Sequence, residues 1–413
     1  MADLFQLSCP VCGRPYAHGP LIFCEECFTP LEITYDLEQI RHRLTRRVIE
    51  ARRSDMWRYR ELLPVADATG HDLPVGFTPL LESRGLGRRL GLSDLHLKND
   101  SVCLPTLSFK DRVVAVALAQ AKHFGLTVVG CASTGNLANS VAAQAARLGL
   151  EAWILVPASL EPAKLLATAV YGAHLVRVDG NYDQVNRLCA EIAETRSIGF
   201  VNVNLRAYYA EGSKTVAFEI AEQLGWRLPD NVVVPMAGGA QISRIAKGFR
   251  ELVELGLVAE RPVRLFGAQA EGCSPIATAV RTGARQIMPQ KPDTICRSLA
   301  IGDPADGYRA TTEIRQSGGA AESASDPEII AGMRLLAETE GIFGETAAGV
   351  TIASLAKLVR QGRIGAHQTT VACITGNGLK TTDALSESLP LGPVIPARLE
   401  AAEPLLEGRV AAA

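Results

Sequence analysis

The chain has 413 residues, 47% hydrophobic and 21% charged, a composition typical of a folded protein of two or three domains. Its 42 basic and 44 acidic residues give a net charge of -2, which argues against nucleic acid or an anionic membrane as partner and favours a small-molecule ligand. Because the N-terminus has no signal-peptide pattern and no apolar run approaches the roughly 18 residues of a membrane span, we expect no membrane association and a cytoplasmic location.

Two cysteine pairs of the CxxC type lie near the N-terminus, separated by eleven residues: Cys9 and Cys12, then Cys24 and Cys27. Four thiolates with no open position predict a structural Zn²⁺ site in a zinc ribbon over residues 1–35, which is too short to fold on apolar burial alone. Disulfides, redox dithiols and a rubredoxin-like iron site are the alternatives. Six further cysteines are scattered singly, as is usual in a reducing compartment.

Residues 36–63 are rich in arginine, with leucine, isoleucine and valine recurring at helical spacing. This pattern predicts an amphipathic helix whose arginines form a solvated face. Nucleic-acid binding is the less favoured interpretation of the same charges.

The stretch PTLSFKDR, residues 105–112, precedes the apolar run VVAVALAQA and therefore predicts the start of a helix. Ser108 would be the N-cap and Asp111 the third helical residue. A charged lysine at the positive end of a helix dipole is unfavourable, which makes Lys110 unusual. An ordinary solvated surface lysine is the alternative for Lys110 taken alone.

Short β-branched runs alternate with helical patterns from about residue 95 onward, which predicts an α/β fold with parallel sheets. One series of strands is expected at 126–132, 151–157, 173–179 and 199–204, and a second series at about 231–235, 263–270 and 369–374. We therefore predict two open three-layer domains. A small domain, 98–205, would be inserted between 36–97 and 206–390 of a large one, with a tail at 391–413.

Three predicted turns between a strand and a helix carry polar residues: CASTGN (131–136), MAGGAQ (236–241) and CITGNG (373–378). Ligands gather at the carboxyl ends of strands in such sheets, where helix N-termini bind anions. Taken singly, these turns could be ordinary caps or tight packing. Together with Lys110 they predict a phosphorylated aldehyde cofactor, pyridoxal phosphate, held by a lysine whose pKa desolvation lowers.

Six motifs in order, PTLSFKDR, ASTGN, EGSKTVAFEIAEQLGW, PMAGGAQISRIAKGF, GIFGETAAG and TGNGLK, resemble the threonine synthases among the fold-type II (tryptophan synthase β-like) pyridoxal phosphate enzymes. The N-terminal cysteine segment resembles the zinc ribbon of some members. The resemblance implies that Lys110 forms the Schiff base, Asn136 bonds the 3-hydroxyl of the cofactor, and Thr375 faces its pyridine nitrogen. The residues implied for its phosphate are Ala237, Gly238, Gly239, Ala240 and Gln241.

The same resemblance implies a homodimer that converts O-phospho-L-homoserine and water to L-threonine and phosphate. Ser133 and Thr134 would bind the carboxylate of the substrate, and Asn202, Asn204 and Arg206 its phosphate. A β-replacement or elimination on O-phosphoserine, serine or threonine is the alternative activity, and a non-catalytic descendant whose ribbon contacts other proteins is a further one. The chain departs from the usual motifs at Leu107, Leu137, Val203, Ala237, Gly238 and Thr346.

Overall fold

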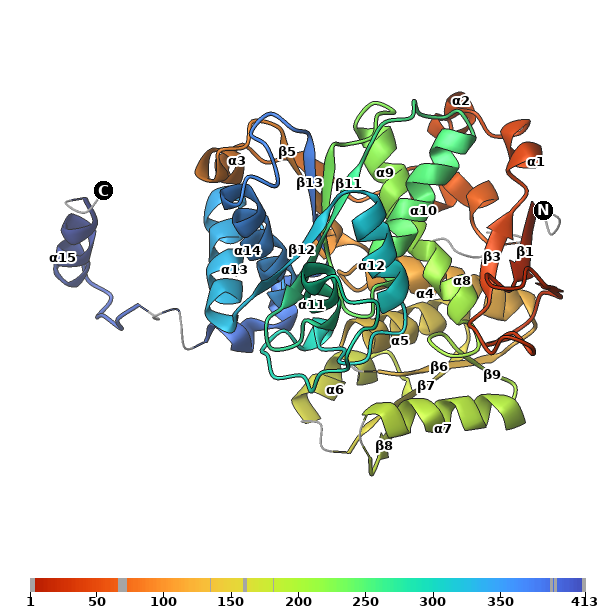
Figure 1. Cartoon of the computed structure of the whole chain (residues 1–413). Helices are drawn as coiled ribbons and strands as arrows, with labels where there is room; N and C mark the ends of the chain where they lie inside the picture. The colour runs from red at the N-terminus through yellow and green to blue at the C-terminus, as the bar shows by residue number, and fades with distance from the viewer. Residues whose placement is uncertain are drawn as a thin grey trace.

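A computed structural model describes residues 4–65, 73–133, 135–158, 162–180, 182–386, 389 and 392–410. The described residues contain two open sheets and a small ribbon sheet (Figure 1). The larger sheet has the order β12-β11-β10-β13-β5-β4, and only the β4–β5 pair is antiparallel. Its strands are Ala320–Ala324 (β12), Arg264–Ala270 (β11), Asn231–Pro235 (β10), Thr370–Ile374 (β13), Leu95–Asn99 (β5) and Leu80–Glu82 (β4).

The smaller sheet is wholly parallel and has the order β8-β7-β6-β9. Its strands are His174–Val178 (β8), Glu151–Pro157 (β7), Val128–Ala132 (β6) and Ile198–Phe200 (β9). Because all four lie between β5 and β10 in the chain, the small sheet is inserted into the large one, as the sequence predicts. The predicted α/β class with two open sheets is confirmed.

Helices cover both faces of each sheet, which gives the predicted three layers (Figure 1). On the large sheet, α3 (Arg84–Leu90), α13 (Asp326–Glu340) and α14 (Thr346–Arg360) lie on one side. The other side carries α9 (Thr215–Gln223), α10 (Ala240–Glu254), α11 (Pro275–Thr282) and α12 (Gly307–Gln316). The small sheet lies between α7 (Tyr182–Thr195) and a layer that contains α4 (Lys110–His123), α5 (Asn136–Leu148) and α6 (Pro162–Ala169). The short helix α8 (Arg206–Glu211) packs on α4.

The predicted strands at 126–132, 151–157 and 173–179 are confirmed as β6, β7 and β8. The strand predicted at 199–204 is shorter, because β9 ends at Phe200 and the chain turns. Asn204 holds this turn: its Oδ1 accepts from the Phe200 amide at 2.8 Å and its Nδ2 donates to the Ile198 carbonyl at 2.9 Å. The strand β5 runs on to Asn99, past the predicted boundary at residue 97, and the domain boundaries stay a prediction.

The single amphipathic helix predicted over 36–63 is wrong. This segment forms α1 (Leu37–Arg41), α2 (Arg46–Glu50) and a 3-10 helix, η2 (Met56–Leu62), because side chains of Thr45 and Asp55 cap new helical starts inside it. Several arginines are exposed as expected, but Arg58 is buried and forms an ion pair with Glu222 at 3.0 Å.

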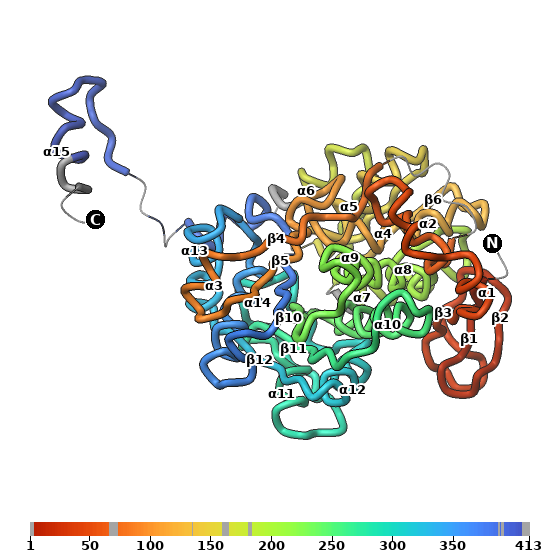
Figure 2. The backbone as a smooth tube through the Cα atoms, turned by 90° about the horizontal axis from the view of Figure 1, so that it is seen from above, coloured from red at the N-terminus to blue at the C-terminus, as the bar shows by residue number. Residues whose placement is uncertain are grey.

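The N-terminal ribbon has the strand order β2-β1-β3, formed by Phe5–Ser8 (β1), Pro15–Tyr16 (β2) and Glu32–Tyr35 (β3). It lies at the opposite end of the molecule from the C-terminal helix α15 (Leu399–Val410), which stands apart from the body in both views (Figures 1 and 2). No helix in the described ranges combines the length and the apolar composition needed to cross a membrane.

Candidate active site

The segment that carries Lys110 is attached by its backbone to the chain that leaves β13. The amide of Phe109 donates to the carbonyl of Thr375 at 2.8 Å, and the amide of Asn377 donates to the carbonyl of Leu107 at 3.1 Å. Two motifs far apart in the sequence, PTLSFK and TGNG, therefore lie side by side. The pairing brings Lys110 close to the buried Thr375, at the carboxyl end of the inner strand β13 of the large sheet.

Leu107, one of the departures from the family motif, has a φ of 60° and so lies in the left-handed region. A side chain there costs about 1–2 kcal/mol relative to glycine, which explains why glycine is usual at this position.

The predicted capping of α4 by Ser108 is wrong. The helix begins at Lys110 after Phe109, which has helical backbone angles, and no side chain caps it. The carboxylate of Asp111 instead binds Thr106, through its amide at 2.9 Å and its hydroxyl at 2.7 Å, and the hydroxyl of Ser140 at 2.7 Å. Ser108 Oγ is left buried without a hydrogen-bond partner among the described residues.

The amine of Lys110 points to a tyrosine that the sequence analysis did not single out. Lys110 Nζ donates to Tyr209 Oη at 3.0 Å, and Tyr209 lies on α8. The neighbouring tyrosines of the LRAYYAEG stretch offered no local signal, because helical periodicity does not show which of the two faces Lys110.

Asn136 begins α5 and is held by two charged side chains. Its Nδ2 donates to Glu345 Oε2 at 2.8 Å, and its Oδ1 accepts from Lys380 Nζ at 2.8 Å. Burial raises the pKa of Glu345 above its usual value, although Asn136 and the charges of Lys380 and Lys110 oppose this shift. Glu345 and Lys380 lie within the motifs GIFGETAAG and TGNGLK, but the sequence analysis gave neither a role.

The turn between β10 and α10, residues 237–241, is open on one side, and we call it the cradle. Gly239 has a φ of 92°, and a Cβ there would lie 2.9 Å from both the Asp306 carbonyl and Ala310 Cβ, so only glycine fits. A Cβ on Gly238 would meet nothing within 4 Å. Gln241 Nε2 is a buried donor without a partner among the described residues. A helix N-terminus, an open glycine and an unpaired donor are what a phosphate group requires, so these residues fit the cofactor predicted from the sequence.

The residues predicted for the substrate separate into two groups. Arg206 Nη2 is 2.5 Å from Asp306 Oδ2, and the amide of Asp306 donates to the carbonyl of Gly238, so Arg206 lies beside the cradle. Asn202 Oδ1 accepts from the amide of Ala132 at 3.4 Å, next to the predicted carboxylate ligand Ser133. Asn204 uses both ends of its amide on the backbone of its own turn. Thr134 lies outside the described residues.

Two of the departures from the family motifs, Leu137 and Val203, are packed apolar side chains in the structure. Leu137 belongs to the main core, and Val203 packs against the core of the small sheet. Thr346, where proline is usual, is buried at the start of α14, and its Oγ1 has no partner among the described residues.

Behind Lys110 lies a fully buried ionic cluster that the sequence analysis missed. The guanidinium of Arg112 binds Asp100 at 2.8 Å and also contacts Glu219, which in turn lies 2.6 Å from Lys98 Nζ. Burial alone would raise the pKa of Glu219, but Arg112 and Lys98 hold it at about 2. The available signal in the sequence was the presence of Arg112 and Glu219 within otherwise apolar helical segments. Charged side chains at such positions are buried only when they are paired.

The four N-terminal cysteines converge at one point. Their Sγ atoms all lie within 4.8 Å of one another, and Cys12 Sγ is 3.8 Å from Cys24 Sγ. A tetrahedral Zn²⁺ with Zn–S bonds of about 2.3 Å requires S···S distances of about 3.8 Å. Burial raises the pKa of Cys9, but the amides of Cys12 and Val11 and the Thr29 hydroxyl lower it to about 6.

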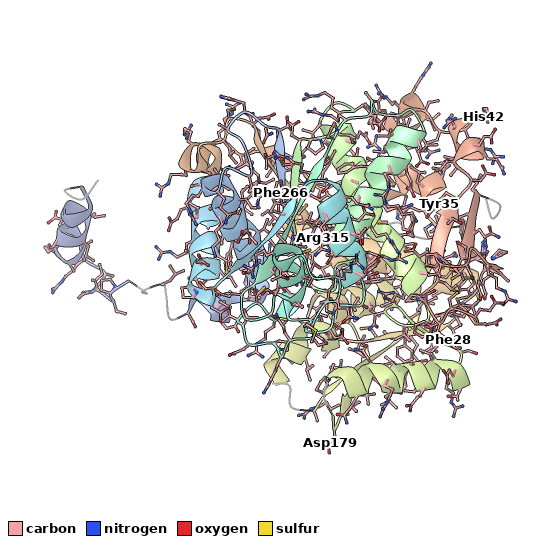
Figure 3. The ribbon with its side chains drawn as sticks, viewed as in Figure 1. Phe28, Tyr35, His42, Asp179, Phe266 and Arg315 are labelled. Atoms are coloured by element: carbon pink, nitrogen blue, oxygen red, sulfur yellow. The ribbon has the colours of Figure 1, made fainter. Side chains whose placement is uncertain are left out.

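The N-terminal ribbon packs against the rest of the protein near α8, the helix that carries Tyr209. Gly19 exchanges two 3.1 Å hydrogen bonds with the hydroxyl of Tyr208, the neighbour of Tyr209. Tyr35, labelled in Figure 3, lies with its ring 3.8 Å from Lys214 Nζ. Arg244 of α10 binds Glu32 of β3 at 2.8 Å. These hydrogen bonds and this ion pair are partly buried, so the ribbon is an integral part of the fold.

One α/β sheet inserted into another, with a lysine, a glycine turn and a fixed asparagine near the strand ends, is the arrangement of an enzyme that binds a phosphorylated cofactor. The chain belongs to the pyridoxal-phosphate dependent enzyme family, which it matches over residues 71–376. It is 40% identical to the threonine synthase of Methanocaldococcus jannaschii, over 91% of this chain and 93% of that protein. It is 34% identical to the threonine synthase of Methanosarcina acetivorans, over 98% of this chain and all of that one.

Solved structures share the fold at lower identity. The processed form of threonine deaminase isoform 2 from Solanum lycopersicum is 20% identical, with a TM-score of 0.62 over 78% of this chain and 90% of that chain. Maize serine racemase is 20% identical, with a TM-score of 0.61 over 76% and 94%.

Proposed function

We propose that this protein is a pyridoxal-phosphate-dependent threonine synthase, which converts O-phospho-L-homoserine and water to L-threonine and phosphate. The observation that carries the proposal is the similarity to a threonine synthase over 98% of this chain and the whole of that relative, ribbon included. The arrangement around Lys110 supports it, because the residues present fit the cofactor.

Each residue of the site has a role in this proposal. Lys110 would hold the cofactor, remove the α-proton of the substrate and shuttle protons at its β-carbon, since a desolvated lysine amine is both nucleophile and base. The cradle at 237–241 would bind the cofactor phosphate, Asn136 its ring oxygen, and Thr375 its ring nitrogen. The bound cofactor would supply the electron sink for the carbanion.

Arg206, Asn202 and Ser133 are the proposed substrate ligands, which is supported by the ion pair of Arg206 with Asp306 beside the glycine turn and by the hydrogen bond of Asn202 to the residue before Ser133. Ser133 would bind the carboxylate of the substrate and Asn202 and Arg206 its phosphate, with Arg206 the stronger phosphate ligand because a guanidinium binds phosphate oxygens bidentately. Asp306 would then hold Arg206 in place. Asn204 would act through the backbone turn that carries Arg206, and Thr134 stays a sequence prediction.

We further propose that the cysteine cluster binds one structural Zn²⁺. Without a cation, hydrogen bonding to Cys12 and burial raise the pKa of Cys27 to about 12, so four thiolates would form only around a metal. A homodimer, a cytoplasmic location and the domain boundaries at 35/36, 97/98, 205/206 and 390/391 complete the proposal.

The deciding experiment mixes the purified protein, loaded with pyridoxal phosphate, with O-phospho-L-homoserine and measures both phosphate and threonine. We expect equal amounts of both products. O-phospho-L-serine serves as the matched substrate, one methylene shorter. Phosphate release from O-phospho-L-serine alone would replace the proposed reaction by the β-replacement or elimination alternative.

A further inference from the structure

The amide of Asn136 is held between a cation and a carboxylate, which leaves it one orientation. Lys380 Nζ donates to Oδ1 and Glu345 Oε2 accepts from Nδ2, both at 2.8 Å. Turning the amide over would set its NH₂ group against the ammonium and its oxygen against the carboxylate, which removes both hydrogen bonds and adds two repulsions.

Both groups that hold the amide are themselves fixed to the chain that leaves β13. The amide of Glu345 donates to the Gly376 carbonyl at 2.9 Å, and a Cβ at position 376 would collide with the Glu345 carboxylate. Lys380 lies four residues further on and also donates to the carbonyl of Thr106, in the segment before Lys110. Glu345 and Lys380 therefore connect Asn136 to the segments that carry Thr375 and Lys110.

We propose that Lys380 is a positioning residue, which together with Glu345 presents the second Nδ2 hydrogen of Asn136 as a fixed donor to the ring oxygen of pyridoxal phosphate. This inference rests on the proposed function. An amide carries two N–H donors, and Glu345 uses one of them. With Oδ1 turned to Lys380 and one Nδ2 hydrogen on Glu345, Asn136 keeps its second Nδ2 hydrogen to donate to a ligand, which suits an anionic oxygen.

One further observation agrees with a role beyond packing. Burial lowers the pKa of Lys380, with Glu345 and Asp111 opposing, so this ammonium is kept inside the protein by its partners. An ammonium that is costly to bury is retained where its hydrogen bonds hold something in place.

The test measures the dissociation constant of pyridoxal phosphate for the apo-protein, followed by the absorbance of bound cofactor. Lys380→Met should weaken binding about tenfold, the effect of losing one oriented hydrogen bond to a charged oxygen. In the Asn136→Ala background, the same substitution should change binding by less than about twofold, because Lys380 acts through Asn136. The matched control is Lys357→Met, since Lys357, in the last turn of α14, also bonds a carbonyl and a carboxylate, both at 2.7 Å.

An equal loss in both backgrounds, or no loss in either, would overturn the proposal. A thermal melting curve shows whether the Lys380→Met apo-protein is folded. If it is not, the dissociation constant of pyridoxal phosphate is measured for Lys380→Gln and judged by the same criteria. Glutamine keeps the site polar, but its side chain is one atom shorter than lysine and does not reach Asn136. If the wild-type protein itself does not bind pyridoxal phosphate, the proposed function fails instead, and the two failures are thereby distinguished.

Discussion

Lys110 Nζ and Tyr209 Oη lie 3.0 Å apart and join the first residue of α4 to the middle of α8. The neighbouring tyrosine, Tyr208, uses its hydroxyl on Gly19 of the ribbon. One helix thus contacts both the proposed cofactor lysine and the proposed metal-binding segment.

Tyr209→Phe is expected to lower kcat for threonine formation about tenfold, because Lys110 loses the hydrogen bond that orients its amine. Tyr208→Phe is the matched control, with a loss of thermal stability and little change in kcat. Both variants are measured by steady-state kinetics and thermal melting. A kcat unchanged in Tyr209→Phe would show that the 3.0 Å contact does not serve catalysis.

Lys110→Ala is expected to abolish turnover and the absorbance of bound cofactor while the protein stays folded. The side chain is at the first turn of α4 and takes no part in the buried cluster of Arg112. Circular dichroism checks the fold, and a product assay checks turnover. Retained activity would remove Lys110 from the proposed mechanism.

Gly239 and Gly238 form a matched pair for the cradle. Gly239→Ala places a Cβ 2.9 Å from a carbonyl oxygen at a φ of 92°, so we expect a loss of about 1–3 kcal/mol in the free energy of unfolding of the apo-protein. Gly238→Ala meets open space, and its loss should stay below about 1 kcal/mol. Urea unfolding measures both, and equal losses would contradict the described turn.

Glu219→Gln is expected to destabilise the protein by about 3–5 kcal/mol, because it leaves Arg112 and Lys98 buried beside a neutral group. The pKa of Glu219 is lowered from 4.5 to about 2 on folding. Its stabilising contribution is therefore complete above about pH 4.5 and is lost as the pH falls toward 2. Melting temperatures measured across this range should fall less steeply for Glu219→Gln than for the wild type.

Removal of Zn²⁺ with a chelator is expected to release one ion per chain and to lower the melting temperature, because the ribbon has little core of its own. Cys27→Ser should reproduce the effect. Cys273→Ser, which changes a buried single cysteine in the body, should keep its zinc. Elemental analysis of each purified protein gives the metal content, and a zinc-free wild type with the same melting temperature would contradict the assignment.

The sequence by itself was enough to predict the α/β class, the insertion of one sheet into the other, the cysteine cluster and the position of Lys110 at a helix start. These features follow from local patterns: the periodicity of apolar residues, the spacing of cysteines, and turn residues between strand and helix. Even the departure at Leu107 was visible, although its left-handed backbone was not.

Only the tertiary structure decided which partners those residues meet. It paired Lys110 with Tyr209, placed Asn136 between Glu345 and Lys380, and brought Ser140 to the carboxylate of Asp111. It also divided one predicted helix into three, because Asp55 and Thr45 bonded to nearby amides. These hydrogen bonds of Lys110, Asp111 and Asn136 join residues between 29 and 244 positions apart, so they depend on the packed fold and no local pattern encodes them.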